Sequence, residues 1–447
     1  MRKISSDQFL TTLAETFGVG RRIALGAVAS VGLVLLLAVF WFFHSAPPST
    51  IVITTGPEGS MFQMIAGRYS TILARNGVKL DILSSQGSQE NLKRLSDRSF
   101  RVDIGFVQAG VTNGINTRKL VSLGSVSYEP LLVFYRSAAT IELLSELNGK
   151  RLAIGAEGSG TRSLALALLD ANGIGPTGTT TLLNLDGQGS ARALLETNAD
   201  AAFMAGDSAP PQLMRTLLRS PGIQLYNFMQ ADGYTRRIHY LNKLEMPRGC
   251  IDFGKNIPSH DVYLVGPTVE LIARANLHPA LSDLLLEAAR EVHGRATLFQ
   301  RKGEFPAPLE QDLPISVDAR HYYTSGKSFL YRSLPFWLAS LVNRILVVFV
   351  PVAVVLIPCL RLIPSLYKWQ IRLRLYRWYR ALLALERGPL SQMTPAKQEE
   401  WLKRLDHIER EVNKMKVPAS FADQFYVLRG HIGFVRAGLQ GNTTAPH

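Results

Sequence analysis

Cysteine is scarce in this chain, which contains only Cys250 and Cys359 among 447 residues. Two cysteines exclude a disulfide framework and a four-cysteine zinc site. Cys359 also falls in a hydrophobic run that we expect to lie in a bilayer, so we do not expect it to pair with Cys250. The histidines between the hydrophobic runs are scattered without the spacing of metal ligands. The sequence therefore predicts neither a metal nor a cofactor.

Catalytic motifs are absent as well. The chain has no G-x-S-x-G nucleophile elbow and no H-E-x-x-H helix. The glycine-rich stretch at residues 155–162, GAEGSGTR, follows an apolar run and precedes a helical one, which suits anion binding. It lacks the Lys-Ser/Thr pair of a phosphate-binding P-loop, and its glycine order differs from the dinucleotide pattern. We therefore expect that this protein is not an enzyme. An enzyme with the fold inferred below is a minor alternative.

Acidic residues are few at the C-terminal end, which helps to explain the net charge of +14. Residues 361–447 carry fifteen Lys and Arg against seven Asp and Glu, whereas the middle of the chain is nearly balanced. A basic excess confined to the ends argues against a nucleic-acid partner.

Two long hydrophobic runs predict contact with a lipid bilayer. Residues 23–43 are uncharged and long enough for a transmembrane helix, with residues 1–22 as a cytoplasmic tail. A cleaved signal peptide is the rival interpretation, although the run is longer than a signal core and His44 occupies a poor cleavage position. Residues 335–360 form the second predicted span, with Arg344 at an interface; a buried hairpin is its alternative.

The charges around these runs predict the topology. A dense basic cluster follows the second run, so both termini are expected in the cytoplasm. Residues 44–334 then face the periplasm of a bacterial inner membrane. Residues 361–447 are predicted to form a basic helix over Trp369–Leu385 and a helical hairpin that begins at Thr394-Pro395.

An internal repeat organises the segment between the runs. The pattern G-x-E-G-S occurs at residues 56–60 and again at 155–159, each time between a β-rich run and a helical pattern. The triplet Q-G-S follows at residues 86–88 and 188–190, before another helix and an aspartate-led strand. We interpret this as a duplicated β-α-β-α-β unit, and hence as two similar α/β lobes.

Two such lobes would face one cleft with their helix N-termini, whose free N–H groups suit a carboxylate or another small anion. Glycines let a ligand approach the backbone, and serine and threonine hydroxyls add donors. Tight turns and helix caps are the alternative role for the serines. Arg162 either pairs with a ligand carboxylate, pairs with Glu157 or lies in solvent. The predicted ligand-binding residues are Gly59, Ser60, Met61, Ser88, Asn91, Gln108, Ser159, Gly160, Thr161, Arg162, Ser190 and Asp207.

Five segments in this order carry a family resemblance: TTGPEGSMF, QGSQENLKRL, VDIGFVQAGV, LNGKRLAIGAEGSGTR and ADAAFMAGDSAPPQL. Residues 51 to about 314 resemble the TAXI-type solute receptors of tripartite ATP-independent periplasmic (TRAP) transporters. The resemblance implies a two-lobed type II periplasmic-binding-protein fold, here flanked by transmembrane helices and a C-terminal helical hairpin. The chain differs from typical members in its C-terminal span and in Met61-Phe62, where they carry Tyr-Tyr.

The expected function is therefore a membrane-anchored receptor that captures a small organic anion or amino acid between two lobes. The resemblance implies TRAP membrane subunits as its partners. The alternative is a ligand sensor that signals through the cytoplasmic helical hairpin.

Overall fold

The computed structural model describes residues 21–44, 46–175, 178–326, 334, 336–386, 394–415 and 421–441. Most of the expected N-terminal tail, residues 1–20, lies outside these ranges. The chain divides into two compact units. One is Ala46–Asn343, and the other combines Met1–Ser45 with Arg344–His447.

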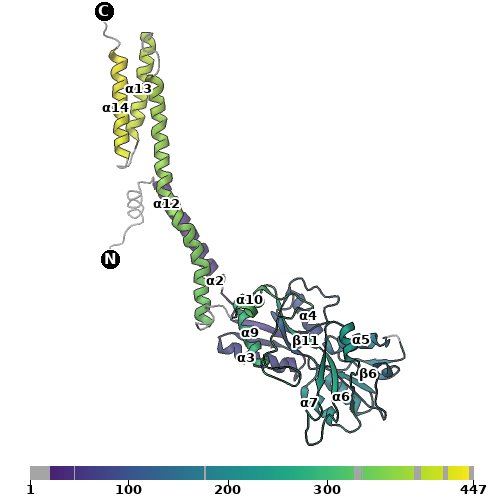
Figure 1. Cartoon of the computed structure of the whole chain (residues 1–447). Coiled ribbons are helices and arrows are strands. Elements are labelled where there is room, and N and C mark those ends of the chain that lie inside the picture. The colour runs from purple at the N-terminus through teal and green to yellow at the C-terminus, as the bar shows by residue number, and fades with distance from the viewer. Residues whose placement is uncertain are drawn as a thin grey trace, which may run out of the picture. The chain divides into compact units, whose positions relative to one another are not determined.

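The larger unit contains two α/β lobes, each with its own sheet (Figure 1). The elements of the first lobe are β1 Thr50–Thr54, α3 Met61–Arg75, β2 Lys79–Leu83, α4 Ser88–Ser96, β3 Ile104–Gln108, β4 Leu120–Tyr128, β11 Val262–Arg274, α9 Pro279–His293 and α10 Val317–Ser325. Strands β2, β1, β3 and β11 are adjacent in that order, and β4 pairs with β11.

The second lobe is formed by the middle of the chain. Its elements are β5 Leu132–Tyr135, η1 Leu144–Leu147, β6 Arg151–Ala153, α5 Gly160–Ala171, β7 Thr181–Leu183, α6 Gly187–Leu195, β8 Ala201–Met204, α7 Pro211–Arg219, β9 Gln224–Leu225, α8 Ala231–Arg237 and β10 Leu241–Met246. The sheet order is β7-β6-β8-β5-β9.

The predicted duplication is confirmed by the strand pairing. In the first lobe β1 lies between β2 and β3 and is parallel to both; in the second lobe β6 lies between β7 and β8 in the same way. An antiparallel strand then follows each trio, β11 beside β3 and β5 beside β8. Each lobe is thus one β-α-β-α-β unit with an added antiparallel strand, and the fold is mixed α/β.

The chain crosses between the lobes in two places. Residues 129–131 connect β4 to β5, and β11 pairs with β10 through Val262–Pro267 but with β3 and β4 through Thr268–Arg274. Glu129 donates its N–H to the Pro267 carbonyl (2.8 Å), which joins the two crossings. The lobes therefore meet at a pair of extended segments, the geometry expected of a hinge.

Apolar side chains cover both faces of the second sheet. Val133 and Tyr135 pack in one apolar cluster, and Leu132 and Phe134 pack in another. Side chains of successive strand residues point to opposite faces, so these apolar runs are buried on both sides. The strand ends of this lobe are therefore anchored in an apolar core on both sides of the sheet.

The smaller unit is helical: it contains α2 Arg21–His44, α13 Pro395–Lys414, α14 Ala422–Gly441 and the part of α12 Phe336–Glu386 that begins at Arg344. Within the described residues, one helix segment is long and apolar enough to cross a membrane, Leu338–Cys359, with a mean hydropathy of 2.4. A shorter apolar helix covers Ala29–His44. Arg344 was expected at a membrane interface. Its guanidinium carbon, Cζ, lies 5.1 Å from the centroid of the Phe42 ring.

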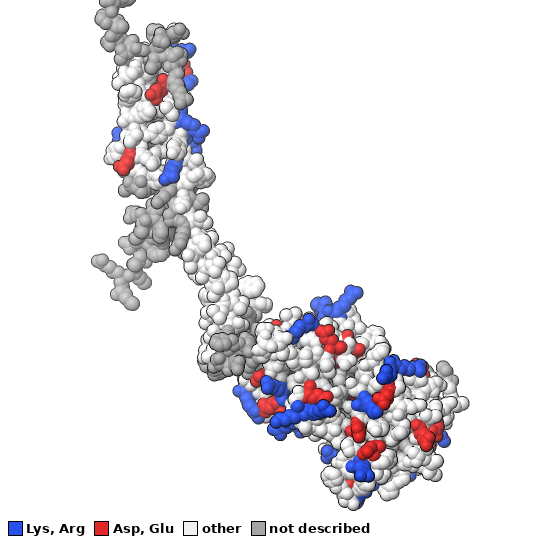
Figure 2. All heavy atoms as spheres, viewed as in Figure 1, with Lys and Arg blue, Asp and Glu red and all other residues white. Residues whose placement is uncertain are grey.

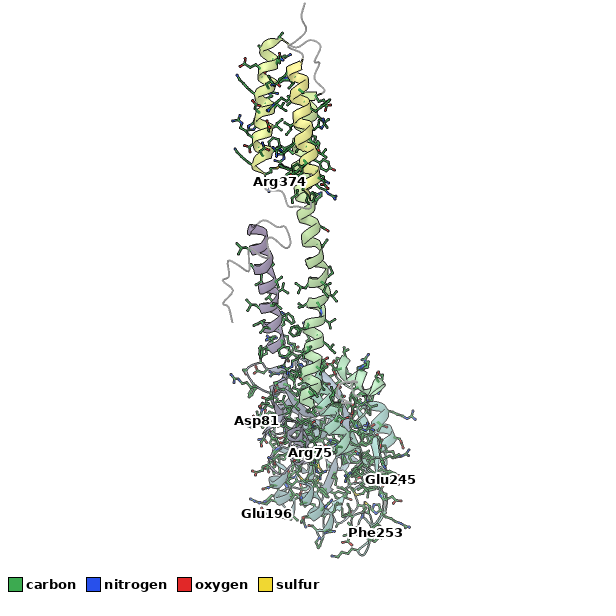
Figure 3. All side chains as sticks on the ribbon, turned by 90° about the vertical axis from the view of Figure 1, so that its left-hand side faces the viewer. Arg75, Asp81, Glu196, Glu245, Phe253 and Arg374 are labelled. Atoms are coloured by element: carbon green, nitrogen blue, oxygen red, sulfur yellow. The ribbon has the colours of Figure 1, made fainter. Side chains whose placement is uncertain are left out.

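Helix α12 continues without interruption through the expected span and the expected basic helix. Its C-terminal part, where Figure 3 labels Arg374, packs with α13 and α14 through one apolar cluster that includes Leu382, Leu405 and Leu428. The expected helical pair is therefore part of a three-helix cluster.

Candidate functional site

The loops that follow the parallel strands of the two lobes are in direct contact. Met61, the first residue of α3, donates its N–H to the Gly206 carbonyl (3.0 Å), and Glu90 of α4 donates to the Gly158 carbonyl (2.9 Å). We call this contact the seam; it comprises residues 56–61, 85–91 and 108 of the first lobe and 155–161 and 206–208 of the second. It lies at the carboxyl ends of the strands, where ligands bind in open parallel sheets.

Asp207 lies at the centre of the seam and is fully buried. Its Oδ2 accepts the N–H of Gly160 (2.6 Å) and the N–H of Ser88 (3.3 Å), and its Oδ1 accepts the Thr161 hydroxyl (2.7 Å). Ser88 and Gly160 are the first residues of α4 and α5. One carboxylate therefore receives free N–H groups from two helix N-termini, one in each lobe.

Three glycines make this approach possible. A Cβ at Gly87 would lie 2.5 Å from Asp207 Oδ2, and one at Gly160 would lie 2.8 Å from the same oxygen. A Cβ at Gly56 would meet the Asp207 carbonyl oxygen. The glycines assigned from the sequence to close approach of a ligand admit Asp207 in this structure.

Gln108 adds an unsatisfied acceptor at the same point. Its Nε2 donates to the Gly160 carbonyl (2.8 Å), while its buried Oε1 has no hydrogen-bond partner among the described residues. A Cβ on Gly160 would collide with Oε1, so this oxygen lies beside the start of α5, close to Asp207. A buried acceptor without a donor costs free energy, and a ligand group that donates would recover it.

A second buried carboxyl, Glu129, lies behind Asp207. Its Oε1 accepts the Asp207 N–H (3.0 Å). Burial, and then the charge of Asp207, raise the pKa of Glu129 to about 8. Burial also raises the pKa of Asp207, while the hydrogen bonds from Thr161, Gly160, Ser208 and Ser88 act in the opposite direction. Glu129 is therefore mainly protonated at neutral pH, which leaves Asp207 as the charged member of the pair.

Four predicted residues lie at the seam with their hydroxyl or amide groups used locally. Ser60 and Ser159 cap α3 and α5, since their Oγ atoms accept the N–H groups of Gln63 (3.3 Å) and Arg162 (3.1 Å). Asn91 bonds inside the first lobe, to the carbonyls of Thr55 and Phe106 and to the hydroxyls of Thr54 and Ser85. Gly59 has a positive φ of 76° and donates to Gln63 Oε1.

Two predicted residues make their hydrogen bonds away from Asp207. The Ser190 hydroxyl donates to the Leu185 carbonyl (3.2 Å) inside the second lobe. The Arg162 guanidinium donates to Asn184 Oδ1, a partner that was not among its expected ones. The structure therefore gathers Met61, Ser88, Gln108, Gly160, Thr161 and Asp207 around one point.

Glu129 was missed by sequence reasoning, and a signal for it exists. It stands alone as an acid within the otherwise uncharged residues 120–135, directly before Pro130. An acid inside an apolar run is either exposed on an edge or buried with a partner. The choice between these required the position of the Asp207 loop.

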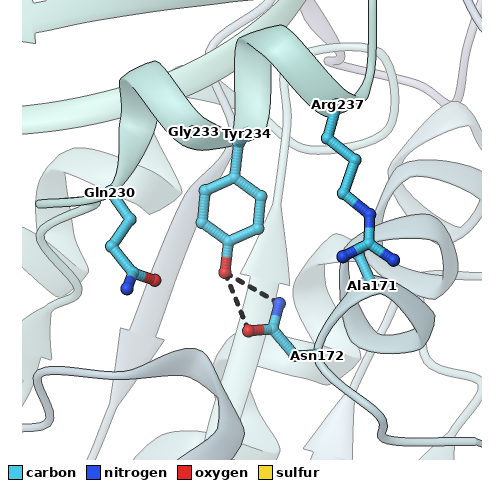
Figure 4. A pocket seen from close by; sticks show the side chains of 6 residues that line it. All are labelled: Ala171, Asn172, Gln230, Gly233, Tyr234 and Arg237. Atoms are coloured by element: carbon cyan, nitrogen blue, oxygen red, sulfur yellow. Dashed lines mark hydrogen bonds between the residues drawn. The ribbon is translucent and has the colours of Figure 1, made fainter.

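Two concavities lie away from the seam. One, of about 390 Å³, has Arg68, Arg75 and Arg295 around Glu291, which pairs with Arg75 (3.1 Å). The other, of about 450 Å³, is shown in Figure 4, where the Tyr234 hydroxyl and the Asn172 amide exchange hydrogen bonds of 2.7 and 3.0 Å. Neither includes a residue predicted from the sequence.

Surface charge and metal-ligand groups give no further indication of a site among the described residues. Figure 2 shows Lys and Arg interspersed with Asp and Glu on the visible face of the larger unit. Among the described residues, no group of three or more His, Cys, Asp or Glu is placed to hold a metal ion.

Comparison with known proteins gives one family match. A family model described as the NMT1-like family matches residues 53–259, which include the whole seam. No protein with a curated description matches the chain.

Solved structures of binding proteins align with about half of the chain. The periplasmic aliphatic sulphonate binding protein SsuA from Escherichia coli shares 16% identity over 55% of this chain and 73% of its own, with a TM-score of 0.35. An ancestral arginine-binding protein bound to arginine shares 12% identity over 55% and 92%, with a TM-score of 0.36. A putative methionine-binding lipoprotein from Bacillus subtilis subsp. subtilis str. 168 shares 14% identity over 55% and 92%, with a TM-score of 0.34. These scores are low, so the fold described above rests on the strand order of this chain.

Proposed function

We propose that this protein is a membrane-anchored solute-binding receptor whose two lobes close on a small organic anion or amino acid at the seam. The observation that carries the proposal is the convergence of α4 and α5, from different lobes, on the single carboxylate of Asp207. Helix N-termini attract anions, and an enclosed site strengthens each contact. The hinge-like crossings at residues 129–131 and 266–268 allow the lobes to separate.

A ligand screen on the full chain in detergent micelles tests this function. Carboxylates, amino acids and the corresponding amides are added one at a time, and the thermal unfolding midpoint is measured. A ligand at about 100 times its dissociation constant stabilises the protein by about 2.7 kcal/mol. Amides serve as neutral controls of matched shape, and a carboxylate that raises the midpoint no more than its amide would contradict anion recognition.

Delivery to TRAP-type membrane subunits is the finer part of the proposal. The five segments that resemble TAXI-type receptors support it, and all five lie within the NMT1-like match. Co-purification of the full chain with the membrane subunits of such a transporter tests the pairing. Loss of solute uptake on deletion of this protein, with restoration by the wild-type chain, is the expected result.

The proposed topology has two spans, residues 23–43 and 335–360, with both termini in the cytoplasm and the larger unit in the periplasm. The apolar segment Leu338–Cys359 and the shorter apolar helix Ala29–His44 support it. Reporters fused after residue 390 should be active only if they function in the cytoplasm. A periplasmic reporter that works there would contradict two spans.

The continuity of α12 favours a second candidate, a ligand sensor. One helix runs from the apolar segment into the cluster with α13 and α14, so a displacement of the segment is transmitted to that cluster. Truncation after residue 386 separates the two candidates. An uptake receptor should keep ligand binding and uptake, whereas a sensor should keep binding and lose its cellular output.

A further inference from the structure

Asp207 belongs to the protein, yet its contacts are those expected for a bound anion. Its carboxylate takes the first N–H groups of α4 and α5 together with the Thr161 hydroxyl. Its own side chain is fully buried, and three glycines leave the space that it fills. This is the place where the proposed ligand has to bind.

The N-cap of α4 offers no side-chain acceptor to the Ser88 N–H, whereas the Thr161 hydroxyl also lies 2.7 Å from the Ser208 hydroxyl. The N-cap residue is Gly87, which has a φ of 130° and no side chain to accept an N–H group. Without Asp207, the N–H of Ser88 would be buried and unpaired, whereas the Glu90 N–H is bonded by the Gly158 carbonyl.

Gln108 provides an independent observation at the same point. Its Oε1 is buried, lies beside the start of α5 and has no partner among the described residues. Asp207 has no N–H or O–H group to offer this acceptor when it is ionised. The seam is therefore only partly satisfied by Asp207, as expected for a stand-in that matches a ligand's anionic group but not its neighbouring donor.

We propose that Asp207 is an internal occupant of the anion site, and that a carboxylate ligand binds by displacing it from the N-termini of α4 and α5. This inference rests on the proposed receptor function and deepens it. Asp207 holds the seam closed in the absence of ligand, and the affinity for a ligand is lowered by the competition. A ligand carboxylate with an adjacent amino or hydroxyl donor satisfies Gln108 as well.

Replacement of the carboxylate by a free anion tests the proposal. Asp207→Ala in the full chain removes a group with the shape of formate, so sodium formate is the probe. The thermal unfolding midpoint of this variant should fall, and formate should raise it again by a few degrees in a saturable way at constant ionic strength. Formamide is the neutral control, and wild type is the control for an occupied site.

The outcomes are distinct. Saturable rescue of Asp207→Ala by formate, without an effect of formamide or an effect on wild type, supports the inference. A formate effect no larger than that of formamide, or an equal effect on wild type, overturns it and makes Asp207 a structural residue only.

A second variant keeps the proposal testable if Asp207→Ala does not fold. Asp207→Asn keeps the side-chain volume and loses the charge, so it should compete less well for the helix N-termini. A carboxylate identified in the wild-type screen should bind it at least about fivefold more tightly than wild type. Equal or weaker binding overturns the inference.

The two proposals also fail separately. If no solute stabilises wild type, the receptor function is rejected. The formate rescue of Asp207→Ala still decides whether the site prefers an anion.

Discussion

The two lobes use the same triplet, Q-G-S, in opposite ways. In the second lobe, α6 begins before the triplet, and the exposed Asp186 caps it by accepting the Gly189 N–H (2.6 Å). In the first lobe, α4 begins at the last residue of the triplet, and its N-cap Gly87 provides no side chain. One repeat completes its own helix, whereas the other leaves donors for a group from elsewhere.

The residue two positions before the triplet is Asp186 in the second lobe and Ser84 in the first. Both residue types are good N-caps, but only Asp186 takes that role, and α6 begins directly after it. In the first lobe α4 begins later, at Ser88, and its Ser88 N–H is bonded by Asp207. We conclude that a duplicated motif predicts a duplicated fold, but not a duplicated site.

The largest predicted effect concerns the pH dependence of stability. Asp207, which bonds the first N–H of α4 from the other lobe, is buried beside Glu129, whereas Asp186, which caps α6 locally, is exposed. The folded-state pKa of Glu129, about 8, is above its ordinary value of 4.5, so its contribution is fully present below pH 4.5 and is lost as the pH rises through 8. Each pH unit in that window removes up to about 1.4 kcal/mol of unfolding free energy. Glu129→Gln should flatten this dependence in thermal unfolding of the full chain.

The matched control for that experiment is Glu270→Gln. Glu270 is also buried, and burial together with Asp312 raises its pKa to about 8. It is not among the contacts of Asp207, so this variant should reduce the overall slope and, when combined with Asp207→Ala, leave the rescue by formate unchanged. A slope that Glu129→Gln leaves unchanged would contradict the assignment of Glu129.

The glycines of the two Q-G-S triplets, Gly87 and Gly189, should differ in how much stability is lost when each is replaced by alanine. Gly87→Ala meets Asp207 Oδ2 at 2.5 Å in a left-handed conformation, so we expect a loss of about 2–3 kcal/mol of unfolding free energy. Gly189→Ala lies inside α6, where alanine is favoured by about 0.5–1 kcal/mol, against a close contact of 3.0 Å with Asp186. Its net effect should be within about 1 kcal/mol. Equal losses in chemical unfolding would remove the distinction between the two repeats.

Removal of the local cap should have a smaller effect that stays in the second lobe. Asp186→Ala loses one N-cap bond, at a cost of about 1 kcal/mol. Ligand binding should be unchanged, as should formate rescue when the change is combined with Asp207→Ala, because Asp186 is not among the contacts of Asp207. A change in either would show that α6 takes part in the seam.

The smallest effect is expected for Arg162→Ala. Its guanidinium bonds to Asn184 at the surface, and such contacts contribute little to stability. We expect a change within about 0.5 kcal/mol and ligand affinity within twofold of wild type in the screen. A loss of affinity of tenfold or more would instead restore Arg162 as a ligand-pairing residue.

The sequence alone determined the architecture of the larger unit. Apolar runs of strand length, helical periodicity and two copies of G-x-E-G-S followed by Q-G-S were sufficient to predict two β-α-β-α-β lobes, because these patterns are local and repeat along the chain. They also identified Ser88, Gly160, Thr161 and Asp207 as candidates, since each lies at a strand end or a helix start.

Only the tertiary structure decided how those candidates are used. Ser60 and Ser159 cap their own helices, Asn91 bonds within one lobe, and Asp207 reaches from the second lobe to the first helix turn of α4. A helix N-terminus accepts any anion that reaches it, from the chain or from solution, and sequence patterns do not distinguish the two. The contact depends on how the lobes close at the hinge, over a separation of 119 residues between Ser88 and Asp207.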